Sequence, residues 1–477
     1  MLYCLHNYTG GDPLNETNRN LQISKRSFLT AIAIIFFLML ATYALSFLIP
    51  GGEYARTVNA AGQTVVDASG GYREVPGGLP FWKWLLSPLL VLGAEGSGAL
   101  IAVLVFLLVI GGVFNALTEG GLMHYMLGRL VERCGHVRYR LMAALVLFFM
   151  GMGSLVGSFE EVVPLVPIVV SLAAALGWDS VTGIGMCLLA AGCGFAAGVA
   201  NPFTIGVAQT LAGLPMFSGV WLRLLSFVLI YALLLAFLRG HARHVERPAE
   251  TFAAAGERDE RMDRGLKRFA WILGVGIALV LSSGFLPFLR DYTMIIVAVM
   301  FLAAGIAACL AAGMGGKRLR QSFLTGVKNI APSILMILMA ASIKYTMTEG
   351  HILDSLLHMA VQAAGRMPKA GLVLFIYLIC LVMNFFIASG SAKAFLLIPL
   401  IAPLAQLFGV STQLCIVAFA YGDGFSNVFY PTNAALLIAL GLADTGYGEW
   451  ARFSWKFQGM NLLLTAALLL FGLAVGY

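Results

Sequence analysis

Two adjacent acidic residues stand out because they lie in sequence that is otherwise apolar enough to be buried in lipid. Glu160 and Glu161 end the stretch G-S-F-E-E, which begins at Gly157 and Ser158. A charged side chain at the bilayer centre costs roughly 2.5–3.5 kcal/mol, so two acids there need a proton, a bound ion or a wet cavity. The pair therefore predicts a cation or proton site. A structural ion pair with Lys393 or Lys344 is the alternative, for these two acids and for Asp423.

A helix break follows in the same half of the chain. Asn201 and Pro202 stand in the stretch G-V-A-N-P-F-T, inside a run too long and too apolar to be a surface turn. Asparagine is a common helix cap and proline is favoured at the first helical position, so a half-helix begins here. Backbone groups freed by a break within a membrane must bind something. The break is therefore a second candidate binding element.

Composition places these residues in a polytopic membrane protein. Hydrophobic residues make up 60% of the 477 residues, charged residues 11%, and the mean hydropathy is +0.89. The net charge of +7 does not indicate nucleic-acid binding, because the basic residues cluster between apolar runs in the positive-inside pattern. The seven cysteines are scattered without a C-x-x-C pair, so we interpret them as core residues rather than metal ligands or disulfides.

The apolar runs and the loops between them divide the chain into two membrane halves. Lys25 and Arg26 precede an apolar run of about twenty residues, which predicts a first membrane helix with a cytoplasmic N-terminus. Cations gather again in the centre of the chain, as expected of a cytoplasmic loop. The predicted units are a disordered cytoplasmic tail (1–24), a first transmembrane half (25–239), a charged cytoplasmic linker (240–268) and a second transmembrane half (269–477).

The second half repeats the first in order and in spacing. The offsets between matching residues stay between 229 and 232, which indicates an internal duplication. The matches are Thr118-Glu119-Gly120 with Thr348-Glu349-Gly350, Pro167 with Pro399, Gly177 with Gly409, Gly194-Phe195 with Gly424-Phe425, Pro202 with Pro431, and Trp221-x-Arg223 with Trp450-x-Arg452.

The number of crossings between the copies determines their relative orientation. The predicted helix at 97–117 and its partner at 324–347 are five spanning steps apart, and an odd number inverts the second copy. Cations such as Lys317 and Arg452 fall on the predicted cytoplasmic ends, which agrees with the inversion. Inverted repeats with interrupted helices are typical of secondary transporters, which bind substrate near the midplane between the copies.

The predicted fold is an all-α polytopic membrane protein with an inverted repeat, about nine full transmembrane spans, two broken helices and two helical hairpins. The hairpins are expected at 139–176 and 370–408. We interpret them as re-entrant because small polar residues stand at corresponding tips, G-S-F-E-E in the first and S-G-S-A-K in the second. Two full pairs of spans would leave the flanking topology unchanged and are the alternative. The C-terminus is expected outside.

The tip and break motifs resemble a known family. The G-S-F-E-E tip, the A-N-P-F-T break, the A-S-G-S tip and the segment G-D-G-F-S-N-x-F-Y-P-T-N (Gly422 to Asn433) are similar to the C4-dicarboxylate anaerobic carrier family, in particular its YfcC-like branch. The resemblance spans most of residues 27–475. It implies an ion-transporter-superfamily fold in a bacterial inner membrane, carrying a small anion or amino acid coupled to Na⁺ or H⁺. Relatives of this fold are commonly dimers.

The tips and breaks have distinct predicted roles. Half-helix N-termini near Glu161, Pro202, Ala392 and Pro431 favour a substrate carboxylate, and oxygen atoms near the opposing ends suit an alkali cation. Side chains that only cap backbone are the alternative. The candidate substrate and ion ligands are Ser158, Glu160, Glu161, Asn201, Pro202, Thr204, Ser389, Gly390, Ser391, Asp423, Asn427, Thr432 and Asn433, with Na⁺ expected at Ser158, Asn201, Ser391 and Asn433.

The sequence therefore predicts an ion-coupled secondary transporter of a small carboxylate or amino acid, working by an elevator or alternating-access motion. Exchange of basic amino acids or C4-dicarboxylates is the alternative, and an ion channel is a remote one. An enzyme is not expected, because the sequence contains no H-E-x-x-H motif and its histidines lie mostly in tails and loops. The expected partners are a small-molecule substrate, the lipid bilayer and a second copy of the chain, with no nucleic acid and no cofactor.

Overall fold

The computed structural model describes residues 25–58, 64–66, 71–94, 97–134, 137–157, 159–215, 217–246, 258–283, 293–364 and 367–477. The predicted tail at 1–24 lies outside this part. Helices dominate the described residues, as the composition predicts. The described residues between 50 and 95 also contain short strands, which pair antiparallel as β1 (Gly52–Tyr54) with β4 (Tyr72–Glu74) and β2 (Arg56–Val58) with β3 (Thr64–Val66).

The surface of the described part is that of a protein surrounded by lipid. Seven of its helices are long and apolar enough to cross a membrane. Large apolar side chains point outward along the helices, including Phe37 (67% exposed), Trp271 (71%) and Leu463 (69%). Exposed apolar side chains of this size along membrane-length helices are expected of a protein that faces lipid. Three of the seven helices are arms of the predicted hairpins, so the total of nine full spans stays a prediction.

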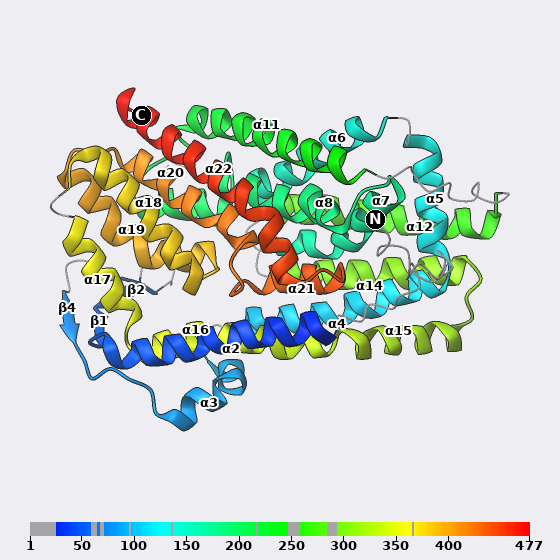
Figure 1. Cartoon of the computed structure of the whole chain (residues 1–477), viewed down its shortest axis with the longest axis horizontal. Coiled ribbons are helices and arrows are strands. Elements are labelled where there is room, and N and C mark those ends of the chain that lie inside the picture. The colour runs from blue at the N-terminus through cyan, green and yellow to red at the C-terminus, as the bar shows by residue number, and fades with distance from the viewer. Residues whose placement is uncertain are drawn as a thin grey trace, which may run out of the picture.

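One group of helices packs side by side, several of them along the lower edge of Figure 1. Its core is the contact of α4 with α14 and α15, while α16 packs on α2 and α3. Pro332 stands at the start of α16, where its missing N–H is tolerated, so the predicted run 324–347 is divided between two helices. The members are α2 (Lys25–Leu48), α3 (Phe81–Leu90), α4 (Ser97–Glu119), α12 (Glu260–Ser283), α14 (Thr293–Ala311), α15 (Gly316–Ile330) and α16 (Pro332–Glu349).

The second group contains the two predicted hairpins and the two broken helices. The first hairpin is α6 (Arg138–Gly151) with η3 (Met152–Val156), then η4 (Glu160–Leu165) with α7 (Val166–Ala175); the second is α18 (Lys369–Phe386) with α19 (Gly390–Leu407). The first broken helix is α8 (Ser180–Ile184), η5 (Gly185–Leu189), α9 (Ala190–Ala197), η6 (Pro202–Gly206) and α10 (Val207–Leu211). The second is α20 (Thr412–Asp423), η7 (Phe425–Val428) and α21 (Ala434–Leu442).

Matching outer helices cover each copy. α11 (Val220–Val245) follows the first broken helix and α22 (Tyr447–Ala474) follows the second; they contact each other along the upper edge of Figure 1. α5 (Leu122–Cys134) and α17 (Leu353–Ala364) link the two groups of helices. The predicted linker 240–268 is helical at both ends, because α11 continues to Val245 and α12 begins at Glu260.

The ends of each hairpin meet, and the two hairpins start from opposite ends of the long axis. Arg138 at the start of α6 donates to the Leu176 carbonyl just after α7 (3.3 Å). In the second hairpin, the Lys369 ammonium lies beside Gly409. Figure 1 shows α6 and α7 towards one end of the molecule and α18 and α19 at the other. Both tips therefore point towards the middle of the molecule's long axis.

Candidate functional site

The first break is held by the first arm of its own hairpin. α9 ends at Ala197, and Gly198 follows in a left-handed conformation (φ +51°) that favours glycine. The Ser154 hydroxyl accepts from the Val199 N–H (3.0 Å) and its carbonyl accepts from the Ala200 N–H (3.0 Å). These two bonds satisfy backbone donors that the interrupted helix leaves unpaired.

Asparagine caps begin both second half-helices. Asn201 Oδ1 accepts from the Thr204 N–H (3.3 Å), as the Asn-Pro pattern predicts. In the second copy, Asn433 Oδ1 accepts from the Leu436 N–H (3.2 Å), so α21 begins at Ala434 and not near Pro431 as expected. Thr432 donates instead to the Phe385 carbonyl (2.6 Å) at the end of α18.

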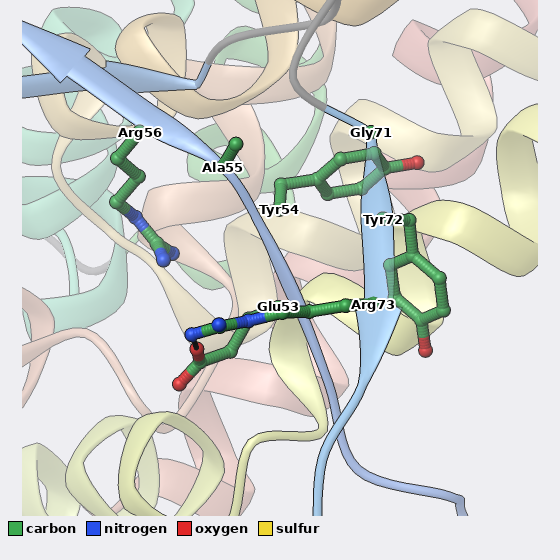
Figure 2. Close-up of a pocket in the computed structure, with 7 residues that line it drawn as sticks. All are labelled: Glu53, Tyr54, Ala55, Arg56, Gly71, Tyr72 and Arg73. Atoms are coloured by element: carbon green, nitrogen blue, oxygen red, sulfur yellow. Dashed lines mark hydrogen bonds and ion pairs between the residues drawn. The ribbon is translucent and has the colours of Figure 1, made fainter.

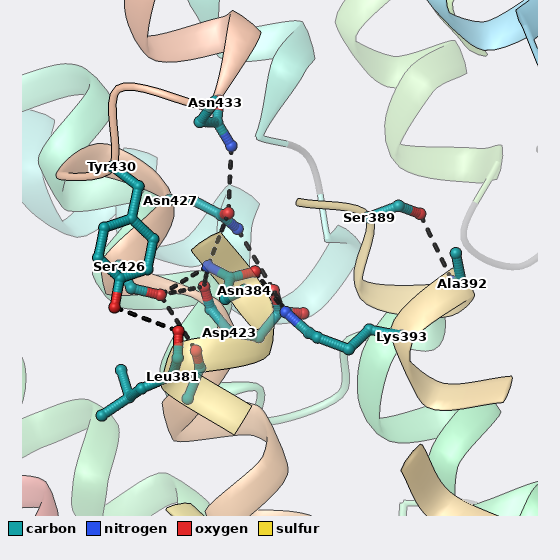
Figure 3. Close-up of polar contacts among 11 residues, drawn as sticks. Leu381, Asn384, Ser389, Ala392, Lys393, Asp423, Ser426, Asn427, Tyr430 and Asn433 are labelled. Carbon is teal, nitrogen blue, oxygen red and sulfur yellow. Dashed lines mark hydrogen bonds and ion pairs between the residues drawn. The ribbon is translucent and has the colours of Figure 1, made fainter. Parts of the chain in front are cut away.

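Asn384 connects the first arm of the second hairpin to the second break. Its Nδ2 group donates to the Asp423 carbonyl (3.0 Å), the Ser426 hydroxyl (2.6 Å) and Asn427 Oδ1 (2.9 Å). Asn427 Oδ1 also accepts from Asn433 Nδ2 (3.1 Å). The side chain of Asn427, a predicted ligand with a backbone cap as its alternative role, thus joins a network of side chains, which Figure 3 shows.

A fully buried ion pair lies at the centre of this network. Lys393 Nζ donates to Asp423 Oδ1 (2.7 Å), and both side chains are 0% exposed. The same ammonium group donates to Asn384 Oδ1. Three segments therefore meet at the Lys393 ammonium (Figure 3): Asn384 comes from α18, Lys393 from α19 and Asp423 from the end of α20. A buried pair of this kind is costly to form and more costly to break, because loss of one partner strands the other charge.

The tip of the second hairpin touches both breaks at Gly390. A Cβ atom at this position would lie 2.4 Å from Asp423 Oδ2 and 2.6 Å from Thr204 Cγ2. Asp423 Oδ2 and Thr204 Oγ1 are buried and have no hydrogen-bond partner within the described part of the chain. One carboxylate oxygen and one hydroxyl are thus available beside Gly390, next to the N-terminus of α19.

Protein donors bind several carbonyl groups that the breaks release. Arg223 of α11 donates to the Val199 carbonyl through Nε (3.3 Å) and Nη2 (3.2 Å). On α22, Trp450 donates to the Val428 carbonyl (2.7 Å) and Gln458 to the Phe425 carbonyl (3.1 Å). The neighbouring outer helices thus supply at least one hydrogen bond to each of these three carbonyl groups.

The structure places the remaining candidates as follows. Ser389 is exposed at the tip, and its hydroxyl accepts from the Ala392 N–H (3.5 Å), whereas Ser391 is half-buried. Asn433 and Asn201, predicted Na⁺ ligands, use their side-chain oxygens as helix caps. The predictions for Ser158 and for the side chains of Glu160, Glu161 and Pro202 fall outside the described residues.

Sequence reasoning overlooked Ser154, Asn384 and Arg223. The offset from Ser154 to Asn384 lies within the range of the repeat, and each is a polar residue near the end of an apolar arm. That matched position was the signal that could have identified them. Arg223 stands in the repeated W-x-R motif, but nothing in the motif indicates that the guanidinium is fully buried.

A separate surface hollow of about 480 Å³ lies between β1 and β4 (Figure 2). Arg73 pairs with Glu53 (3.0 Å) across it, and the Arg73 hydrogen bond holds the pKa of Glu53 below its usual value. Burial and the nearby Asp354 carboxylate raise the pKa of Tyr54 to about 12. The residues lining this hollow come from neither the tips nor the breaks, so we place the candidate site at the breaks.

Comparisons with known proteins agree on a family of carriers. A family model described as C4-dicarboxylate anaerobic carrier matches residues 28–474. The chain is 28% identical over 404 residues to the Escherichia coli (strain K12) protein named "Putative basic amino acid antiporter YfcC", covering 80% of this chain and 79% of that one. It is 25% identical over 388 residues to an uncharacterized Haemophilus influenzae protein, covering 79% and 76%.

Two solved transporter structures are also similar. The YdaH transporter of Alcanivorax borkumensis matches with a TM-score of 0.43 and 19% identity, over 94% of this chain and 99% of that one. MtrF of Neisseria gonorrhoeae, described among antimetabolite efflux pumps, matches with a TM-score of 0.42 and 18% identity, over 96% of both chains.

Proposed function

We propose, from the premise that this chain belongs to the C4-dicarboxylate anaerobic carrier family of membrane transporters, that it is an ion-coupled secondary active transporter of a small carboxylate or an amino acid. The single observation that carries the proposal is the fully buried Lys393–Asp423 pair between a hairpin tip and a helix break. Ionisable groups inside a membrane protein are expensive and are kept where a substrate, ion or proton uses them.

The available polar atoms beside the pair suit a small charged substrate. Asp423 Oδ2 could accept from a substrate ammonium, and the N-terminal turn of α19 at Gly390 favours a carboxylate. A zwitterionic or dicarboxylic molecule would use groups of this kind in a confined space. We assign substrate contacts to Gly390, Asp423 and Thr204. Asn427 donates to Asp423 and accepts from Asn433, so these two residues would position the ion pair.

The coupling ion, Na⁺ or H⁺, is proposed to bind in the first copy. Glu160 and Glu161 supply two acids at the first tip, and adjacent carboxylates do not both ionise easily without a cation. The hydroxyl of Ser158 and the amide oxygen of Asn201 would complete a hard oxygen site for Na⁺. With a proton as coupling ion, one of the two carboxyl groups would carry it.

The division into two groups of helices supports an elevator or alternating-access motion. The hairpins and broken helices form one group, and α2, α4, α15 and α16 belong to the other. We propose that the hairpins are re-entrant, that the N-terminus is cytoplasmic and the C-terminus external, and that two copies form a dimer in the bacterial inner membrane. Arg138 and Lys317 should resist labelling from outside as single cysteines, while Gln362 should react.

Exchange of basic amino acids is a second candidate. The Escherichia coli relative is named as a putative basic amino acid antiporter, and a second cationic group on the substrate could pair with the first-tip acids. In that case external lysine or arginine should accelerate release of the internal amino acid without any ion gradient.

Transport in proteoliposomes tests the proposal. The purified chain would be reconstituted and given labelled C4-dicarboxylates or amino acids under an imposed Na⁺ or pH gradient. We expect saturable uptake that requires one gradient. Glu53→Gln is a matched control, because it removes an acid from an ion pair outside the site and should leave uptake unchanged. Flux that does not saturate and ignores every gradient would indicate a channel and overturn the proposal.

A further inference from the structure

The surroundings of the Lys393 ammonium are those of an alkali-cation site. Its two acceptors are a carboxylate oxygen, Asp423 Oδ1, and an amide oxygen, Asn384 Oδ1. Both are hard oxygen ligands, and they come from two different segments, α18 and the end of α20. An ammonium group is a compact point charge, so it can take the place of a monovalent cation between such ligands.

Charge balance excludes a second cation at the same position. Lys393 neutralises Asp423, and both side chains are 0% exposed, so a bound Na⁺ would add an unpaired charge to a closed interior. The cost of an uncompensated buried charge amounts to several kcal/mol. Asn433, which was expected to hold Na⁺ here, uses its oxygen to cap α21 and its amide to bond Asn427.

The first copy differs in sequence at the matching position. The second arms of the two hairpins are related by the offset from Pro167 to Pro399, and the same offset matches Glu161 with Lys393. One arm therefore carries a cation where the other carries an acid. The repeat is symmetric in its order of elements and opposite in charge at this position.

We propose that the Lys393 ammonium is a built-in substitute for the coupling cation of the second copy, so that this copy binds no ion and only the first copy takes up the coupling ion. This inference deepens the proposed function and rests on it for its role in transport. It replaces the sequence-based expectation of a Na⁺ site near Ser391 and Asn433. Removing the side chain should turn the second copy into a real cation site.

Cation binding to a lysine-free variant tests the inference without any transport assay. Lys393→Ala would be purified in detergent beside the wild type, and the melting temperature would be measured in NaCl, KCl, methylammonium chloride or choline chloride at equal ionic strength. We expect a saturable rise of a few degrees for the variant with a small cation but not with choline. The wild type should lack this additional response.

A second pair of variants keeps the test decisive if Lys393→Ala folds poorly. Lys393→Met with Asp423→Asn removes both charges at once, so it should fold better than either single change and show no added cation response. Lys393→Arg keeps the positive charge, so it should show no added cation response even if the larger guanidinium lowers its melting temperature. A cation response in the double variant equal to that of Lys393→Ala would overturn the inference, as would a Lys393→Ala protein that folds and ignores every small cation.

The ion dependence of transport separates this inference from the proposed function. If the wild type transports, the Hill coefficient of uptake against the coupling-ion concentration should be higher in Lys393→Ala, because one additional ion binds. Ser391→Ala should leave the half-saturating ion concentration unchanged. A raised ion requirement in Ser391→Ala would restore the second ion site and overturn the inference. If the wild-type protein carries no substrate under any gradient, the proposed function is wrong. The melting temperatures of the variants would then still test whether Lys393 replaces a cation.

Discussion

In the first copy of the repeat, Ser154 holds the break by accepting from two backbone N–H groups, whereas its counterpart in the second copy, Asn384, donates to three groups of the second break. The offset from Ser154 to Asn384 also matches buried Cys193 with Asp423, just as the hairpin offset matches Glu161 with Lys393. The second copy therefore contains a complete internal ion pair. The first copy has a thiol where the second has its acid.

The difference suggests how one duplicated framework came to serve two tasks. A copy that is neutralised internally keeps its geometry without an external charge, because each buried charge already has its partner. A copy with two adjacent acids at its tip favours recruitment of a cation or a proton. Under the proposed function, the first copy would bind the coupling ion and the second would supply a permanently formed substrate contact.

The largest expected effect comes from breaking the ion pair of the second copy. Asp423→Asn leaves the Lys393 ammonium buried without a countercharge, which should cost about 3–5 kcal/mol of stability and reduce uptake at least about 100-fold. The matched change in the first copy, Cys193→Ser, should leave uptake within about twofold, because no charge is stranded. Uptake in proteoliposomes and thermal unfolding measure both. Similar losses in the two variants would contradict the asymmetry.

The next largest effect should come from the acids of the first copy, and it should be confined to transport. At least one of Glu160→Gln and Glu161→Gln should abolish uptake while membrane expression stays intact, because we assign these acids to an exchangeable ion rather than to a permanent partner. Expression is followed by fluorescence-detected size exclusion and uptake by labelled substrate. Normal uptake in both variants would remove coupling from the first copy.

A moderate effect should distinguish the outer helices. Arg223 donates to the carbonyls of Val199, Phe217 and Ser218, whereas Gln458 donates to the Phe425 carbonyl. Each buried carbonyl that loses its donor costs about 1–3 kcal/mol. Arg223→Met should therefore lower the melting temperature more than Gln458→Met does. An equal or reversed order would show that the first break does not depend on its arginine.

The smallest effect concerns the caps that begin the broken helices. Asp179 accepts from the Thr182 N–H (3.0 Å), and at the matching position of the second copy Ser411 accepts from the Leu414 N–H (3.4 Å). Burial acts to raise the pKa of Asp179, but hydrogen bonds from His241 and Thr182 outweigh it and hold that pKa below the usual value.

The sign of the pH effect follows from the lowered pKa. The stabilisation by ionised Asp179 is fully present above the ordinary aspartate pKa of about 3.9 and is lost as the pH falls through the lowered folded-state value. Asp179→Asn should thus lower the melting temperature slightly at pH 5, with a gap that closes towards pH 3. Ser411→Ala should show a small gap that does not change with pH. A pH-independent gap at Asp179 would contradict the charged cap.

The helical membrane class, the family and the cap at Asn201 in the first break were predictable from the sequence. Hydropathy, cation placement and repeat spacing are properties of the chain itself, and a capping asparagine such as Asn201 acts on residues two or three positions away. The motifs at the tips and breaks also lie in continuous segments. These features therefore needed no knowledge of how distant helices pack.

Only the tertiary structure decided which polar groups meet. The W-x-R motif is repeated, yet Arg223 is buried and Trp221 is 49% exposed, whereas Trp450 is buried and Arg452 is exposed. Two positions along a helix differ by about 200° around its axis, so a different rotation of α11 and α22 turns opposite members of the same motif towards the core. The partner of Lys393 was likewise undetermined, because Asp423 and Asn384 reach it from separate helices and their approach depends on packing across the whole second copy.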